Sequence, residues 1–248
     1  MNIIVKTGEI IIDNCSTLQI RNNYRYNVYK NKFERGGIMN SVEFYNSCWT
    51  HYLALENALR KVERYVSFET DNFECYSIEF IEQYLAICSE IDVVCKIYCE
   101  EIYPNFKCKD VLDYAYVILE NRTDFKNAKV ECNNIQLEPW KEWSTNPQQH
   151  RNFQNSLNVP PNWWSKYNKV KHERTSLDEN GIPYYKYANL EYVLNSLAGL
   201  FVLCMNCYKE LCEKEGDTIK VPVEPSKLFQ YKGWEEGTYM LGNGVCIS

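Results

Sequence analysis

The spacing of apolar residues changes several times along this chain of 248 residues. Near the start, "IIVKTGEIIID" alternates apolar and polar positions, which predicts one or two short strands within residues 1–20. From Ser41 the period lengthens to three and four residues, as on one face of a helix. The pattern predicts helices over residues 41–66, 78–102 and 109–122, the second ending before Pro104.

The later part of the chain shows the same two patterns. Residues 128–138 look extended, with a turn at the Asn-Asn pair, and the C-terminal tail holds one further candidate strand. Two prolines at 160 and 161 open a helix over residues 162–174, and "DENGIP" predicts a turn. A last helix over residues 188–213 contains "LAGLFVLCM", an apolar run far shorter than a membrane span, so we expect that helix to be buried.

These elements predict a mainly α fold, a helical bundle with small peripheral β elements, in a single domain over residues 1–248. The composition, 45% hydrophobic and 24% charged, is that of a globular protein with a core. The net charge of −6 argues against non-specific coating of a nucleic acid, although it leaves room for a local basic site. The first residues interrupt their apolar positions with charges, so we expect no signal peptide and a cytoplasmic protein that does not contact a membrane.

Twelve cysteines could indicate disulfides or a metal site. The pair in "CMNC", Cys204 and Cys207, has the spacing of half a zinc site, but no compact second pair follows. Without an export signal, disulfides are not expected either. Free thiols buried as small hydrophobic groups are the better interpretation.

The stretch "NWWSKYNKVKHERT", residues 162–175, places one of only three histidines among basic residues. In a helix, each residue advances about 100° around the axis. A buried stripe then forms on one side, and His172 lies on the other with Asn168 and Lys169. The stretch is either a solvated basic face or a site that holds a phosphate and moves a proton.

The chemical argument for a site is the combination of residue types. Imidazole accepts and donates protons near neutral pH, and the surrounding cations can stabilise the charge that develops on a phosphodiester in its transition state. This combination fits metal-independent RNA cleavage, with the ribose 2′-hydroxyl attacking the adjacent phosphate and His172 acting as acid or base. No metal ion and no cofactor is expected.

Two long amphipathic helices, a short one, and a polar "N…KH.R" pattern before a final apolar helix resemble a HEPN domain over residues 41–213. HEPN proteins are common in bacterial toxin–antitoxin and antiviral systems. The resemblance implies a helical core and a metal-independent ribonuclease site formed where two copies of an arginine–histidine motif meet in a dimer.

When the HEPN motif is aligned with this sequence, His172 takes the position of its histidine. Lys166 stands where the family has arginine, and Asn168 and Lys169 are the better placed polar partners of the histidine. We therefore expect His172, Asn168, Lys169 and Lys166 to be catalytic. Lys171 and Arg174 are expected to bind the RNA backbone, and Glu90 to support His172 or a lysine.

Other candidates have ordinary structural interpretations beside the functional ones. Glu90 lies in the acidic pattern of the second long helix, which more often marks a solvated face than a metal site. Four tryptophans (Trp140, Trp143, Trp163, Trp164) and Tyr167 could stack on bases, but clustered aromatics more often form a core or an interface. The chain has no P-loop, GxGxxG, GxSxG or HExxH motif.

The leading hypothesis is a metal-independent endoribonuclease of a bacterial defence or toxin–antitoxin system. It would act on RNA as a homodimer, with an antitoxin or another defence protein as a candidate partner. The alternative is a non-catalytic, dimeric HEPN-like interaction module. A third hypothesis is a nucleotide-binding component that uses the same basic face.

Overall fold

The computed structural model of the protein describes residues 3–6, 9–12, 39–145, 159–217, 220–232, 240–241 and 245–246. The chain divides into two units, residues 1–38 and 39–248, and each is described by itself. In the first unit, strands β1 (Ile3–Lys6) and β2 (Glu9–Ile12) pair as an antiparallel hairpin, as the alternating pattern predicts. That residues 1–248 form a single domain stays a prediction.

The second unit is mainly helical, as expected. Its helices are α2 (Ser41–Phe44), a π-helical turn η1 (Tyr45–Trp49), α3 (Thr50–Val62), α4 (Ile78–Ile102), α5 (Val111–Asn121), α6 (Asn162–His172) and α7 (Leu190–Glu215). Short 3-10 turns are η2 (Thr70–Asn72), η3 (Phe125–Asn127) and η4 (Tyr184–Tyr187). Its strands are β3 (Lys129–Cys132), β4 (Ile135–Leu137), β5 (Gln230–Lys232), β6 (Met240–Leu241) and β7 (Val245–Cys246).

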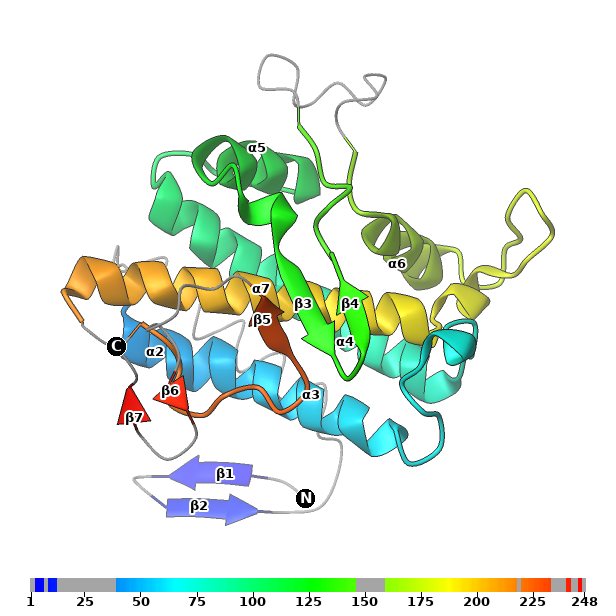
Figure 1. Ribbon diagram of the computed structural model, residues 1–248, viewed down its shortest axis with the longest axis horizontal. Coiled ribbons are helices and arrows are strands. Elements are labelled where there is room, and N and C mark those ends of the chain that lie inside the picture. Colours follow the sequence, from blue (N-terminus) through cyan, green and yellow to red (C-terminus); the bar gives the residue numbers. More distant parts are fainter. Residues whose placement is uncertain are drawn as a thin grey trace. The chain divides into compact units, whose positions relative to one another are not determined.

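Helices α4 and α7 form the central pair of the second unit, and α3 and α6 pack on both of them from opposite sides (Figure 1). Residues at the ends of α4 and α7 determine where these two helices begin and where α7 ends. The Ser77 side chain accepts a hydrogen bond from the Phe80 amide at the start of α4, and Asn189 caps α7 in the same way. Gly216 ends α7 with φ 76°, a left-handed conformation that favours glycine.

The first predicted long helix differs from the structure in two ways. It ends at Val62 rather than Val66, and a π-helical turn interrupts it at Tyr45–Trp49. The Trp49 indole in that turn donates a hydrogen bond to the Glu224 carbonyl at 2.8 Å. This contact joins residues 175 positions apart, so the local apolar pattern carries no sign of the widened turn.

The four tryptophans lie in the core rather than on the surface. The ring of Trp140 is tilted against that of Trp143 and meets that of Trp163 edge to face, with ring centroids 4.6 and 5.2 Å away. Gly199 of α7 makes room for them, because a Cβ atom there would lie 3.2 Å from Trp140 and 3.3 Å from Trp163. The interpretation of these rings as core is confirmed, and they are not available to bases.

A small antiparallel sheet in the order β4-β3-β5 covers part of the helices, with the turn at Asn133–Asn134 as predicted. The segment before β5 is attached to α3 by Glu56, a buried carboxylate. Glu56 accepts hydrogen bonds from the Tyr52 hydroxyl at 2.6 Å, the Lys227 amide at 2.8 Å and the Ser226 hydroxyl. A buried charge fully supplied with donors costs little to keep, so it fixes the returning chain.

Most of the described cysteines are buried free thiols, as the sequence indicates; these include Cys204 and Cys207, while Cys75 is exposed. Burial raises the pKa of both Cys204 and Cys207 well above that of an ordinary thiol. In the described part of the chain, no group of three or more His, Cys, Asp or Glu residues could hold a metal ion.

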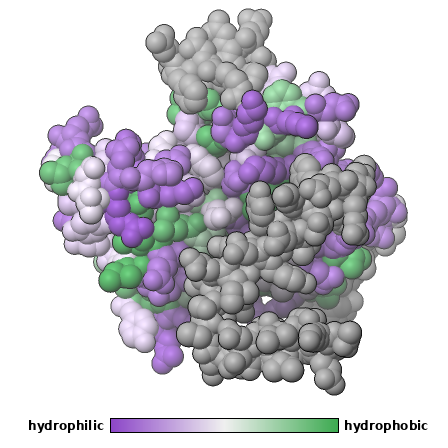
Figure 2. All heavy atoms as spheres, turned by 180° about the vertical axis from the view of Figure 1, so that it is seen from behind, coloured by the Kyte–Doolittle hydropathy of each residue, from purple (hydrophilic) through white to green (hydrophobic). Residues whose placement is uncertain are grey.

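One helix of the described residues, α7, is long and apolar enough to cross a membrane, and 78% of its most apolar window is buried inside the protein. This burial is what a core helix requires, in agreement with the expectation for "LAGLFVLCM". Polar and apolar residues are interleaved on the described surface seen from behind (Figure 2).

Candidate functional site

Helix α6 presents the predicted basic stretch on the outside of the α4–α7 pair. Its inner face carries Trp163, Trp164, Tyr167 and Val170, all buried. The Tyr84 hydroxyl of α4 donates a hydrogen bond to the Trp163 carbonyl and fixes the start of α6 on the core. The predicted buried stripe is confirmed, and the helix is shorter than expected by two residues because Glu173 is its C-cap.

His172 is the last residue of α6 and is exposed. Within the described ranges, neither ring nitrogen has a hydrogen-bond or ion-pair partner. Asn168, one turn earlier, is exposed on the same stripe of the helix. Because the carbonyl end of a helix repels anions, a phosphate beside His172 would depend on side-chain cations rather than on helix amides.

Lys169 supplies a cation next to this stripe, and its ammonium forms an ion pair with Glu173. Its Nζ atom lies 2.8 Å from the Glu173 carboxylate, and both side chains are more than 40% exposed. This ion pair raises the pKa of Lys169. The same ammonium lies 5.4 Å from the ring centroid of Tyr184 in η4.

Lys166 lies on another side of the helix. The six-residue step from Lys166 to His172 turns the helix by about 600°, which leaves the two side chains about 120° apart. Its Nζ atom lies 3.9 Å from the ring centroid of Tyr187. The structure therefore groups Lys166 with η4 and groups His172 with Asn168 and Lys169.

The two remaining basic residues lie near the end of α6. The ammonium of Lys171 is 5.5 Å from the ring centroid of Tyr167, and its side chain is exposed. Arg174, also exposed, follows the helix, and its Nε atom donates to the Val170 carbonyl at 3.5 Å. Both cations lie at the same end of α6 as His172.

The loop from α6 to η4 is held by Asp178, in the predicted turn. Its carboxylate accepts hydrogen bonds from the amides of Asn180 and Ile182 at 2.9 and 2.8 Å, and from the Tyr187 hydroxyl. The Tyr187 hydrogen bond, with the two amides, holds the pKa of Asp178 below its usual range. We call the exposed side of α6 with η4 the α6–η4 surface, which carries Lys166, Asn168, Lys169, Lys171, His172, Arg174, Tyr184 and Tyr187.

Glu90 does not belong to this surface, so the expectation that it supports His172 or a lysine there is wrong. Its Oε2 atom lies 2.8 Å from Nδ1 of His51, on α3. Glu90 is six residues beyond Tyr84, which faces α6, so it projects about 120° away around α4. It is 4% exposed, and His51 is 29% exposed.

His51 was not among the predicted site residues, although the sequence holds two signs of it. It lies between Cys48, Tyr52 and Leu55, at the edge of the apolar stripe of its helix. Glu90 stands directly before Ile91 in the apolar stripe of α4. A carboxylate and an imidazole at the borders of the apolar stripes of two helices can come into contact. Whether they do so depends on how the helices pack.

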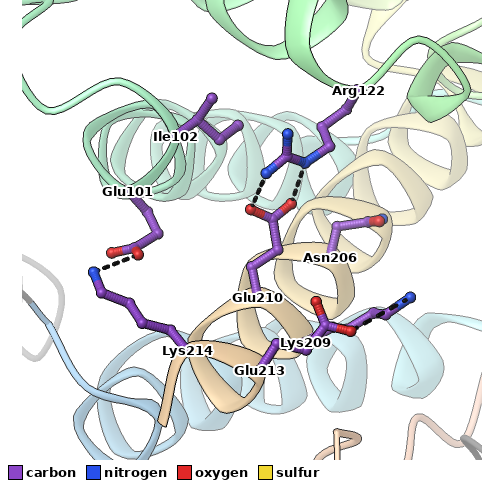
Figure 3. Close-up of a pocket in the computed structure, with 8 residues that line it drawn as sticks. All are labelled: Glu101, Ile102, Arg122, Asn206, Lys209, Glu210, Glu213 and Lys214. Atoms are coloured by element: carbon purple, nitrogen blue, oxygen red, sulfur yellow. Dashed lines mark hydrogen bonds and ion pairs between the residues drawn. The ribbon is translucent and has the colours of Figure 1, made fainter. Parts of the chain in front are cut away.

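The chain also contains a charged pocket of about 510 Å³ between the ends of α4, α5 and α7 (Figure 3). Its charges are paired with one another. The Arg122 guanidinium donates two hydrogen bonds of 2.6 Å to the Glu210 carboxylate, and Nζ of Lys214 lies 2.6 Å from Oε1 of Glu101. None of the residues predicted from the sequence lines this pocket, and its ion pairs serve to join the three helices.

Comparison of the chain with models of known protein families, with curated protein sequences and with solved structures found no match.

The α6–η4 surface is therefore assessed by its chemistry. It offers an exposed imidazole and an exposed amide on one stripe, with ammonium groups beside them that lie near tyrosine rings. These groups can bind phosphates and move a proton. The His51–Glu90 pair offers an oriented imidazole but lies on the other side of α4.

Proposed function

We propose that the protein is a metal-independent endoribonuclease of the HEPN type and that His172 is its proton-transfer residue. The observation that carries this proposal is the exposed position of His172 at the end of α6, beside Asn168 and Lys169, with Lys171 and Arg174 at the same end. An imidazole that is open to solvent can reach a bound phosphodiester.

The proposed reaction needs one proton removed and one proton supplied. A base takes the proton of the ribose 2′-hydroxyl, whose oxygen then attacks the adjacent phosphorus. The bond from phosphorus to the 5′ oxygen breaks, and an acid protonates that leaving oxygen. The products are a 2′,3′-cyclic phosphate and a 5′-hydroxyl end, and His172 performs one of the two proton transfers.

The second proton transfer is assigned to another copy of the chain. His51 faces away from α6, so it does not reach a phosphate held at His172. Four apolar side chains are exposed on the α6–η4 loop and around the start of α4: Tyr76, Ile78, Leu177 and Ile182. They support a homodimer in which two α6–η4 surfaces meet.

The setting of the reaction follows from the resemblance to HEPN proteins. It adds a role in bacterial defence or toxin–antitoxin systems, an antitoxin or defence protein as partner, and the cytoplasm as the place of action. The second candidate function is the non-catalytic dimeric module. It is favoured by Lys166, which stands at the position of the family's arginine and whose ammonium lies against Tyr187.

The test is cleavage of tRNA, mRNA and rRNA by the purified protein in EDTA, beside a His172→Ala variant. The proposal predicts 2′,3′-cyclic phosphate ends from the intact protein and at least about 100-fold slower cleavage by the variant, because general acid–base catalysis contributes that much. Circular dichroism on heating shows that the variant is folded.

Mixing the intact protein with the His172→Ala variant also tests the dimer. We expect a mixture of His172→Ala and intact protein to lose activity in proportion to the mixed dimers formed. No cleavage of any RNA by the intact protein would overturn the ribonuclease and favour the interaction module.

A further inference from the structure

Lys166 is held in place without an ion pair. In the described part of the chain no carboxylate lies within ion-pair distance of its ammonium, which instead lies 3.9 Å from the ring centroid of Tyr187. The negative face of an aromatic ring attracts a cation but does not neutralise it. The ammonium is thus fixed in position and still able to bind an anion.

Tyr187 is itself fixed by the loop. Its hydroxyl donates to Asp178, and its ring packs 6.1 Å from the ring of Tyr184 and 6.1 Å from that of Tyr192. The hydrogen bond to Asp178 raises the pKa of Tyr187 to about 12. The hydroxyl therefore stays protonated, and remains the donor, at any physiological pH.

Asp178 attracts Lys166, which helps to lower the pKa of this carboxyl, but the two side chains do not form an ion pair. The oxygens of Asp178 accept hydrogen bonds from the loop. The amides of Asn180 and Ile182 share one oxygen and the Tyr187 hydroxyl takes the other. The Asp178 amide also donates to the Ile182 carbonyl at 2.9 Å, which closes the turn. The turn fixes Tyr187 through the hydrogen bond to Asp178, and the ring of Tyr187 contacts the ammonium of Lys166.

The position of Lys166 on α6 decides which phosphate it can reach. It is six residues before His172, which separates the two Cα atoms by about 9 Å along the axis and by about 120° around it. An ammonium anchored on Tyr187 is turned away from the stripe of His172. It does not share one phosphate with that imidazole.

We infer that Lys166, positioned by Tyr187 and Asp178, binds a phosphate next to the one that is cleaved. This inference rests on the proposed function, since it assigns a subsite of the same RNA. It gives Lys166 a binding role in place of the catalytic role expected from its place in the motif. Tyr187 and Asp178 are positioning residues that act through Lys166.

The first test is equilibrium binding of a single-stranded RNA, in the His172→Ala background, over a series of salt concentrations. Each phosphate contact with single-stranded nucleic acid contributes about 0.7 to the slope of log K against log salt. We expect Lys166→Met to reduce the slope by about 0.7. Tyr187→Leu should do the same, whereas Tyr187→Phe keeps the ring and should keep most of the slope.

Lys186→Met is the matched control. The ammonium of Lys186 lies 5.5 Å from the ring centroid of Tyr76, so it is a lysine of the same loop with the same kind of ring contact. Lys186 belongs to η4, but its ammonium lies against Tyr76 and not against Tyr187, and we expect its loss to leave the slope unchanged. In cleavage assays, Lys166→Met should raise KM and leave kcat unchanged.

A second test observes the positioning directly and needs no RNA. Protons above a ring are shielded, so the ε-methylene protons of Lys166 should resonate upfield of those of other lysines. The shift should remain in Tyr187→Phe and vanish in Tyr187→Leu. Ordinary shifts in the intact protein would overturn the positioning.

The two proposals fail in different ways. If RNA is cleaved but Lys166→Met leaves the salt slope unchanged or lowers kcat, the neighbouring-phosphate assignment is wrong and the ribonuclease stands. If RNA binds with the predicted slopes but is not cleaved, the ribonuclease is wrong, and Lys166 remains a phosphate-binding residue with no cleaved phosphate beside it. If no RNA binds at all, both are overturned.

Discussion

The two described histidines of the helical unit lie in opposite surroundings. His51, on α3, contacts the buried Glu90 of α4 at 2.8 Å. His172, at the end of α6, is exposed and has no such partner in the ranges that the structure covers. The carboxylate of Glu90, which the sequence suggests as support for His172, supports the other histidine.

The imidazole of His51 is held in one orientation by a carboxylate, whereas the imidazole of His172 is accessible to solvent. A carboxylate behind an imidazole fixes its ring and its tautomer, an arrangement used both in catalysis and in structural bracing. The His51–Glu90 pair joins two helices, and no basic residue of the α6–η4 surface lies beside it. His172 lacks this support but lies among cationic and amide groups of the kind that can bind phosphate. We therefore assign bracing to His51 and chemistry to His172.

The largest expected effect on stability is that of His51→Ala. Glu90 is buried but His51 is partly exposed, so the loss of the imidazole deprives one buried carboxylate of this partner, and we expect the free energy of unfolding to fall by about 2 kcal/mol. Urea unfolding measures this value. Adding Glu90→Gln removes the buried charge and should recover at least about 1 kcal/mol, since paired residues are not additive. A loss below about 1 kcal/mol for His51→Ala alone would show that the pair does not brace the helices.

A smaller effect is expected at Asp178. The Tyr187 hydroxyl is the first cause of the lowered pKa of this carboxyl, so Tyr187→Phe should raise the pKa towards the ordinary value of 3.8. A carboxyl with a lowered pKa in the folded state adds stability above its ordinary pKa and loses it as the pH falls through the folded value. Carbon-13 NMR titration of the carboxyl measures the shift. An unchanged pKa would contradict the hydrogen bond that holds the loop.

The smallest effect is expected from the ion pair on α6. Lys169 and Glu173 are each more than 40% exposed, and an ion pair between exposed side chains contributes little to stability because solvent screens it. Glu173→Gln should therefore leave the free energy of unfolding nearly unchanged, as measured by urea unfolding. It should also strengthen RNA binding, because Lys169 is then released from its carboxylate. A loss above about 1 kcal/mol would mark the end of α6 as part of the structural framework.

Much of the fold could be predicted from local patterns. The observed bounds of α4, Ile78–Ile102, agree with the prediction, because Ser77 is an N-cap and Pro104 lies just beyond the end. The turn at Asn133 was predictable too, since asparagine tolerates its φ of 53°. In each case the deciding residues lie within a few positions of the element they define.

Features set by distant contacts could not be predicted in this way. The π-helical turn before α3 accompanies the bond from Trp49 to Glu224. The partner of Glu90 depends on how the helices pack, and the position of the Tyr187 ring beside Lys166 depends on the loop over residues 173–183. At the candidate site, the exposed stripe of His172 followed from helical periodicity, whereas the partners of the surrounding charges did not.

The most direct test compares His172→Gln and His51→Gln in one assay of RNA cleavage in EDTA, with urea unfolding of the same preparations. We predict that His172→Gln slows cleavage by at least about 100-fold and leaves stability unchanged within about 0.5 kcal/mol. His51→Gln should lower stability and retain cleavage. If cleavage instead disappears with His51 and survives without His172, the assignment of chemistry to the α6–η4 surface is wrong.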